Sequence, residues 1–163
     1  MSYVCGNCIC EAWLGENTSN CYTDCETCFL AGTPVTMADG SKKPIEKIRK
    51  NDMILAYDQE SSQFKPDKVT KLLRHKSKGY LIVNGHLKVT PNHRVFSSGR
   101  WIEIGSLKIG DTLFNDKGHA ETINSIEHMP GKARTYNLEV NPFHTYIAGG
   151  YVVHNQKNCM PDF

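Results

Sequence analysis

The sequence contains no apolar run close to the roughly 20 residues that a membrane-spanning helix needs. Its first residues, MSYVCGNCIC, lack a basic stretch followed by an apolar core, so we expect no signal peptide. The formal net charge of +2 is too small to predict nucleic-acid binding. Sustained helical periodicity is also missing, which favours a fold with little helix. We therefore expect no membrane segment and no nucleic-acid partner, and the sequence assigns no cellular compartment.

Cysteine is missing from most of the chain. Seven cysteines are present, an odd number, yet none lies between Cys28 and Cys159. Residues 1–27 hold five of them and few aliphatic side chains, so this segment is not expected to fold alone without disulfides, metal or a partner. The composition divides the chain into an N-terminal flank (1–27), a 128-residue body (28–155) and a short polar C-terminal flank (156–163).

The N-terminal cysteines allow three interpretations, which the sequence leaves open. Pairs spaced Cys-x2-Cys suit a tetrahedral zinc or iron–sulfur site. The same residues could form a disulfide cluster, or they could belong to the flank of a larger precursor. The residues concerned are Cys5, Cys8, Cys10, Cys21 and Cys25.

The body is predicted to be all-β. Two short apolar alternations, residues 80–83 and 86–90, flank Asn84-Gly85, a strong hairpin signal. Residues 33–37, 136–140 and 146–153 are further strand candidates, the last one interrupted by Gly149-Gly150. Residues 44–48 could form a single helical turn, and the basic stretch 71–78 is interpreted as a solvated strand or loop.

An internal repeat relates two parts of the body. Residues 40–54 (GSKKPIEKIRKNDMI) match residues 99–113 (GRWIEIGSLKIGDTL) at a constant offset of 59. Thr33-Pro34 and Thr90-Pro91 are aligned to extend the match at an offset of 57. The repeat predicts two β subdomains related by pseudo-symmetry, with a cleft that brings the two ends of the body together.

The body starts and ends on reactive side chains. Cys28 opens it, His154-Asn155 close it, and a Thr-x-x-His motif runs from Thr90 to His93. A thiol can attack the preceding carbonyl, an Asn carboxamide can attack its own carbonyl, and histidines can move protons near neutral pH. Taken alone, Cys28 would be interpreted as a small buried apolar residue rather than as a nucleophile. Together, these residue types predict cleavage of the chain's own peptide bonds.

The body closely resembles the Hint family, the autoprocessing β fold of inteins and Hedgehog C-terminal domains. The matching segments are CFLAGTPVTMADGSKKPIEKIRKNDMILAYD, GHLKVTPNHRVF and RTYNLEVNPFHTYIAGGYVVHN, in the family's order. Fewer than 50 residues separate the Thr-x-x-His motif from Tyr136, too few for a homing endonuclease. The resemblance implies a minimal intein, or a bacterial intein-like domain.

The resemblance also implies roles for named residues. Cys28 would attack the Thr27 carbonyl and form a thioester, His93 would protonate the departing nitrogen, and Thr90 would orient the scissile bond. His144 and His154 would assist cyclisation of Asn155 to a succinimide, which frees Gln156 and the residues after it. The sequence leaves open how the two histidines divide this work, and His144 could instead be a surface loop residue.

Two positions depart from splicing inteins. Gln156 stands where Cys, Ser or Thr usually follows the terminal Asn, and Asn137 replaces the Asp of a Tyr-Asp-Leu motif. Cys159 could accept the acyl group, but in poor orientation. We therefore expect a single-turnover, self-cleaving monomer that acts in cis without cofactor or required metal, with little protein splicing. The alternative is a cysteine-rich metal-binding or interaction module on an inert Hint scaffold.

Overall fold

A computed structural model describes residues 28–155 of the chain. Thirteen strands and two short 3-10 helices follow one another in this range. In chain order they are β1 (Phe29–Leu30), β2 (Pro34–Thr36), β3 (Lys42–Pro44), η2 (Ile45–Lys47), β4 (Met53–Asp58), β5 (Gln63–Val83), β6 (Leu87–Val89), β7 (Arg94–Ser97), β8 (Arg100–Glu103), η3 (Ile104–Ser106), β9 (Thr112–Phe114), β10 (Ala120–Thr122), β11 (Ile126–Asn141), β12 (Thr145–Ala148) and β13 (Tyr151–His154). The described part of the chain is therefore all-β, as the sequence predicts.

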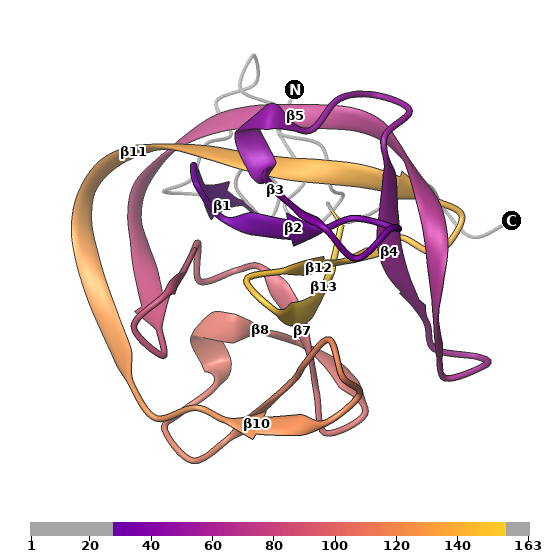
Figure 1. The fold of residues 1–163 in the computed structure, drawn as a ribbon. Coiled ribbons are helices and arrows are strands. Elements are labelled where there is room, and N and C mark those ends of the chain that lie inside the picture. The colour runs from indigo at the N-terminus through magenta and orange to yellow at the C-terminus, as the bar shows by residue number, and fades with distance from the viewer. Residues whose placement is uncertain (1–27, 156–163) are drawn as a thin grey trace, which may run out of the picture.

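The strands form three antiparallel sheets. One has the order β11-β1-β6-β5-β4, with an additional pairing of β11 with β5, and a second has the order β3-β2-β12-β13-β7-β8. The third is the β9–β10 pair. Figure 1 shows β5 and β11 as two long curved ribbons that run side by side around the molecule, and their register extends from Ile126–Val83 to Asn141–Lys68. The described residues contain no helix with the length and hydrophobicity needed to span a bilayer.

Glycine and asparagine set the two turns that the sequence predicts. Asn84 and Gly85 have φ values of 53° and 75°, and β5 turns there into β6. Gly149 and Gly150 have φ values of 60° and 86° and join β12 to β13. Left-handed φ values carry little steric cost for glycine and a modest one for asparagine. These turns direct β12 and β13 into the interior, where all but one of their residues are buried.

The repeat predicted from the sequence corresponds to a repeated backbone structure. η2 and η3 occupy matching positions, and Ile45 and Ile104 are both fully buried. Each 3-10 helix is followed by an aspartate whose side chain accepts a backbone N–H three residues earlier. The hydrogen bonds are Arg49 N to Asp52 Oδ2 at 2.9 Å and Lys108 N to Asp111 Oδ2 at 2.8 Å. The pseudo-symmetry thus extends to individual hydrogen bonds.

The alignment of Thr33-Pro34 with Thr90-Pro91 is wrong. The N–H of Ile45 donates to the Thr33 carbonyl at 2.9 Å, and the N–H of the equivalent Ile104 donates to the His93 carbonyl at 2.9 Å. Thr33 is therefore equivalent to His93. Strand pairing sets this register, because Pro34 lies opposite Pro44 and Arg94 opposite Glu103. The shared Thr-Pro dipeptide is a coincidence of composition.

Two apolar clusters stabilise the fold. The larger contains residues from nearly every strand, including Phe29, Val89 and Tyr146. The smaller is built around Tyr57, Phe96, Ile147 and Val152, with Trp101 and other aromatic side chains packed against it. Since β1, β12 and β13 contribute to these clusters, the two ends of the body are fixed by the core.

Candidate functional site

Cys28 is held at the start of β1 by Thr90. The thiol residue is fully buried, and its N–H donates to Thr90 Oγ1 at 2.8 Å. The Thr90 N–H donates to the Cys28 carbonyl at 2.9 Å, and its hydroxyl lies 3.2 Å from the same oxygen. The Cys28 nitrogen belongs to the Thr27–Cys28 peptide bond. Thr90 therefore holds the nitrogen of the Thr27–Cys28 peptide bond.

His93 connects the two ends of the body. It is almost completely buried, and its Nε2 lies 2.9 Å from the carbonyl oxygen of His154. A carbonyl oxygen only accepts hydrogen bonds, so Nε2 carries the proton, and in the neutral ring Nδ1 holds the lone pair. The Phe29 ring packs against the imidazole with a centroid separation of 4.2 Å. A continuous path of contacts thus links Cys28 through Thr90 and His93 to His154.

Asn155 is buried at the other end of this path. Its backbone N–H donates to the His144 carbonyl at 2.8 Å, and its side-chain Nδ2 donates to the Val140 carbonyl at 3.2 Å. Asn155 Oδ1 is buried and has no hydrogen-bond partner within the described residues. A buried acceptor without a partner is costly unless another state of the site uses it.

His154 is oriented toward the carbonyl of Asn155, whose bond to the Gln156 nitrogen cyclisation would break. Its Nδ1 lies 3.1 Å from that oxygen, so Nδ1 is the donor nitrogen. The pKa of His154 is lowered from 6.5 to about 4, chiefly by burial. The hydrogen bond to Asn155 opposes this shift, and the nearby Arg94 and His144 contribute to it. His154 is therefore a neutral imidazole near neutral pH that polarises a carbonyl.

The depressed pKa of His154 predicts a pH-dependent stability. Below the ordinary pKa of 6.5 the unfolded chain binds a proton that the folded chain excludes, so the stability contribution is lost as the pH falls toward about 4. The loss should reach ~2–3 kcal/mol. The test uses a chain that carries Cys28→Ala and Asn155→Ala. In that background, His154→Gln should make the free energy of unfolding in urea much less dependent on pH between these two values. His86→Gln, at an exposed site, is the control. An unchanged pH dependence in His154→Gln would contradict the assignment.

His144 lies in a loop that the fold holds in an unusual conformation. Its φ is +60°, a left-handed value that is uncommon outside glycine. The buried Asp67 accepts the Phe143 N–H at 2.9 Å, and Thr145 Oγ1 accepts the Tyr57 N–H and donates to the Tyr57 carbonyl, both at 2.8 Å. The His144 ring stacks on His154 at a centroid distance of 6.5 Å. The half-buried His144 therefore lies in a loop beside His154, and the contribution of Asp67 to that loop carries no signal in the sequence.

Tyr146 is a site residue that the sequence analysis missed. Its hydroxyl donates to Asn137 Oδ1 at 2.6 Å, and the same oxygen accepts the Leu138 N–H at 2.8 Å. Burial raises the pKa of Tyr146 well above its ordinary value, and the neighbouring Cys28 contributes in the same direction. Asn137 follows Tyr136, which pairs with Phe29 beside Cys28. Thus a neutral phenol lies near the thiol, and its hydrogen-bond partner is the side-chain amide of Asn137.

Tyr146→Phe should slow release of residues 1–27 several-fold and leave cleavage after Asn155 unchanged. The change removes one buried hydrogen bond, so it should also cost about 1 kcal/mol of stability. Tyr151→Phe is the matched control, because its hydroxyl accepts from Asn84 Nδ2 at 3.2 Å away from the junctions. Mass spectrometry over time measures both cleavages. Equal effects of the two variants on both cleavages would remove Tyr146 from the site.

A cavity of about 380 Å³ opens beside His154. Trp101, Phe143 and Thr145 line it together with Tyr57 and its acidic neighbours Asp58 and Glu60. The Trp101 ring meets the His154 ring edge to face at 5.1 Å. This cavity therefore adjoins the C-terminal end of the body.

Several predicted residues lie outside the described range. They are the scissile neighbours Thr27 and Gln156, the tail residue Cys159 and the five cysteines Cys5, Cys8, Cys10, Cys21 and Cys25. Between residues 28 and 155, no group of three or more His, Cys, Asp or Glu side chains is arranged to hold a metal ion. The three interpretations of the N-terminal cysteines stay open.

Residues 35–158 match the pretoxin HINT domain family. RecA proteins of Mycobacterium shimoidei and Mycobacterium leprae are 32% identical over 109 residues and 31% identical over 105 residues, each covering 56% of this chain. The chain spans only 25% and 15% of the length of these two relatives.

Solved structures of inteins share the fold. A bacterial intein-like domain from Clostridium thermocellum superposes with a TM-score of 0.74 at 25% identity, covering 80% of this chain and 99% of that one. A DnaB intein from Synechocystis sp. PCC 6803 gives 0.71 at 20% identity, with 81% and 100% covered. The chain belongs to the pretoxin HINT domain family and has the all-β Hint fold of intein-like autoprocessing domains.

Proposed function

We propose that residues 28–155 cleave the chain at two junctions, after Thr27 and after Asn155, once and in cis. The observation that supports this most is the path of contacts Cys28–Thr90–His93–His154–Asn155, which links both reactive ends of the body. The family name fits a precursor from which such cleavage frees a flanking segment.

At the N-terminal junction, Cys28 Sγ attacks the Thr27 carbonyl carbon. A carbon–sulfur bond forms, the bond to the Cys28 nitrogen breaks, and the thiol proton ends on that nitrogen. Thr90 holds the nitrogen through the 2.8 Å hydrogen bond, and His93 moves the proton. Water or an added thiol then opens the thioester, which regenerates the Cys28 thiol.

At the C-terminal junction, Asn155 Nδ2 attacks its own carbonyl carbon. A succinimide forms, the bond to the Gln156 nitrogen breaks, and a proton passes from Nδ2 to that nitrogen. His154 Nδ1 polarises the carbonyl at 3.1 Å, and the hydrogen bond to Val140 orients the carboxamide. His144 Nδ1 and Asn155 Oδ1, both buried without a described partner, would pair as the carboxamide turns to react.

Added thiol tests the first step. Dithiothreitol should accelerate release of residues 1–27 in proportion to its concentration and yield that fragment as a dithiothreitol thioester, which hydroxylamine converts to a hydroxamate. Matched incubation with tris(carboxyethyl)phosphine, a reductant without a thiol, separates thioester capture from disulfide reduction. If both reductants act equally and no adduct forms, the chain does not pass through a thioester, and the inert cysteine-rich module gains support.

A further inference from the structure

The middle of the β5–β11 ladder carries a cluster of basic side chains. Arg74, Lys76 and Arg134 are exposed there, with Lys78 and Lys132 close along the same two strands. Lys76 lies directly opposite Arg134 in the ladder, an arrangement of like charges that is unfavourable by itself. The ion pairs Lys42–Asp116, Lys43–Asp52 and Lys65–Asp58 lie elsewhere in the described part of the chain and do not involve Arg74, Lys76 or Arg134.

The basic side chains surround a cavity. It has a volume of about 410 Å³ and is lined by Arg74, His75, Lys76, Arg134, Thr135 and Tyr136. Several donors converge on one concave surface, so an anionic group would be bound by more than one cation. Tyr136 and Thr135 are also the residues of β11 that pair with Phe29 and Leu30 of β1. The basic cavity therefore adjoins the strand that follows the N-terminal flank.

Charge is divided unequally along the chain. Residues 28–155 contain 18 Lys and Arg against 12 Asp and Glu, a formal charge of +6. Residues 1–27 contain four acidic residues and no Lys or Arg, a formal charge of −4. The four are Glu11, Glu16, Asp24 and Glu26. The flank is thus acidic, opposite in charge to the basic cavity.

The flank is attached within reach of the cluster. Arg74 is opposite Tyr136, which is opposite Phe29, so β1 and Arg74 are two strand spacings apart, or roughly 10 Å. Asp24 and Glu26 precede Cys28 by four and two residues, a reach of up to about 14 and 7 Å before side-chain length is counted. A tethered segment also has a high effective concentration at its site.

We propose that the acidic residues of the N-terminal flank 1–27 dock on the basic cavity formed by Arg74, Lys76 and Arg134. The flank is then held over the paired strands β1 and β11, next to the Thr27–Cys28 junction, independently of whether that junction is cut.

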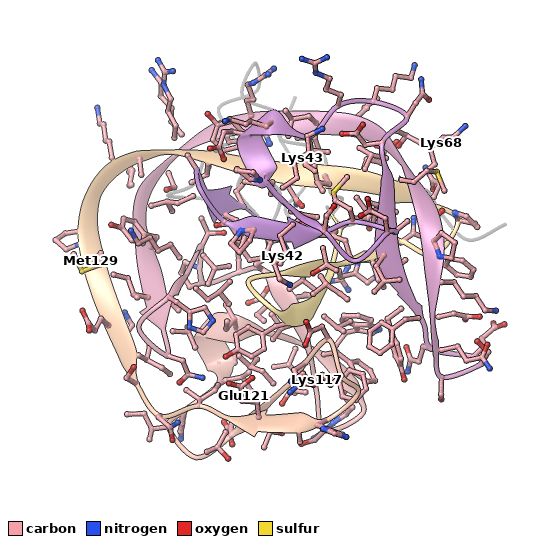
Figure 2. The ribbon with its side chains drawn as sticks, viewed as in Figure 1. Lys42, Lys43, Lys68, Lys117, Glu121 and Met129 are labelled. Atoms are coloured by element: carbon pink, nitrogen blue, oxygen red, sulfur yellow. The ribbon has the colours of Figure 1, made fainter. Side chains whose placement is uncertain are left out.

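Zero-length carbodiimide crosslinking tests the docking directly, since it joins carboxylates only to amines in contact. The full chain is used with Cys28→Ala and Asn155→Ala, which keeps the flanks attached. Crosslinks from Asp24 or Glu26 to Lys76, Lys78 or Lys132 are expected at low salt, and their yield should fall by roughly fivefold in 1 M salt, where the Debye length is about 3 Å. Lys42 and Lys117, labelled in Figure 2 away from the β5–β11 ladder, report background coupling.

Charge variants distinguish docking on this cluster from attraction of the acidic flank to the overall positive charge of residues 28–155. Arg74→Ser with Arg134→Ser should lower the yield as salt does, whereas Arg100→Ser with Lys108→Ser, an equal loss of exposed charge elsewhere, should not. Mixing isotope-labelled and unlabelled chains identifies crosslinks within one chain. The proposal would be overturned if crosslinks are spread evenly over the lysines, form mainly between chains, or are missing at the cluster. It would also be overturned if the two variant pairs have equal effects. If the two variant pairs have equal effects and inorganic phosphate is found to bind at the cluster, the cavity binds an anion other than the flank.

Discussion

Cys28→Ala should abolish release of residues 1–27 while cleavage after Asn155 continues. The methyl group offers no nucleophile, so the Thr27–Cys28 amide is left to uncatalysed hydrolysis. In the proposed mechanism the C-terminal step uses Asn155 and His154, which are anchored by Val140, His144 and the core rather than by the thiol. Mass spectrometry of the purified chain over time measures both fragments.

The reciprocal variants complete this prediction. Asn155→Ala should stop C-terminal cleavage and spare the N-terminal step. His93→Ala should slow the N-terminal step by about 10²–10⁴-fold, the usual contribution of a general acid or base. His86→Ala is the control, because that exposed imidazole lies against the backbone oxygens of Asn84 and Gly149 and the Tyr151 ring, away from both junctions. Release of residues 1–27 by Cys28→Ala at the wild-type rate would refute the nucleophile assignment.

Gln156→Cys should convert a cleaving chain into one that ligates its flanks. The wild-type carboxamide at position 156 is no usable nucleophile at neutral pH, so the Cys28 thioester should pass to water or thiol. A thiol at that position can take the acyl group before Asn155 cyclises, which leaves residues 1–27 joined to 156–163. The joined product, with the body excised, is identified by its mass.

Gln156→Ala is the control for this change, since it alters the junction without adding a nucleophile and should behave as wild type. Cys159 is the one competing thiol after the body, and orientation disfavours it. Efficient ligation by the wild-type chain that persists in Cys159→Ser would show that position 156 does not decide the product.

The fold could be predicted because its signals are local. Asn84-Gly85 and Gly149-Gly150 adopt positive φ values that few other residues tolerate, and the repeated apolar positions Ile45 and Ile104 are fully buried. The alignment of the two Thr-Pro pairs failed because strand pairing, a long-range property, sets the register there. Local composition does not indicate which residues lie opposite one another in paired strands.

The site could be predicted only in part for the same reason. Thr90, His93 and Asn155 belong to short motifs, whereas Tyr146 and Asp67 act through partners distant in sequence, Cys28 and Phe143. The pKa of His154, lowered to about 4, is a consequence of burial that the His-Asn dipeptide does not reveal. Nor does the sequence indicate the left-handed backbone at His144, which follows from the anchoring of its loop.

The mass of the body released from the wild-type chain tests the central claim most directly. Cyclisation of Asn155 consumes no water, so early in the reaction the fragment 28–155 should be lighter by one water than a hydrolysed fragment of the same sequence. Its N-terminus should be a free Cys28 amine, and residues 1–27 should appear as an acid or, with dithiothreitol present, as a thioester. A chain that stays intact under these conditions, or a body that ends from the outset in a free Asn155 carboxylate, would contradict the account.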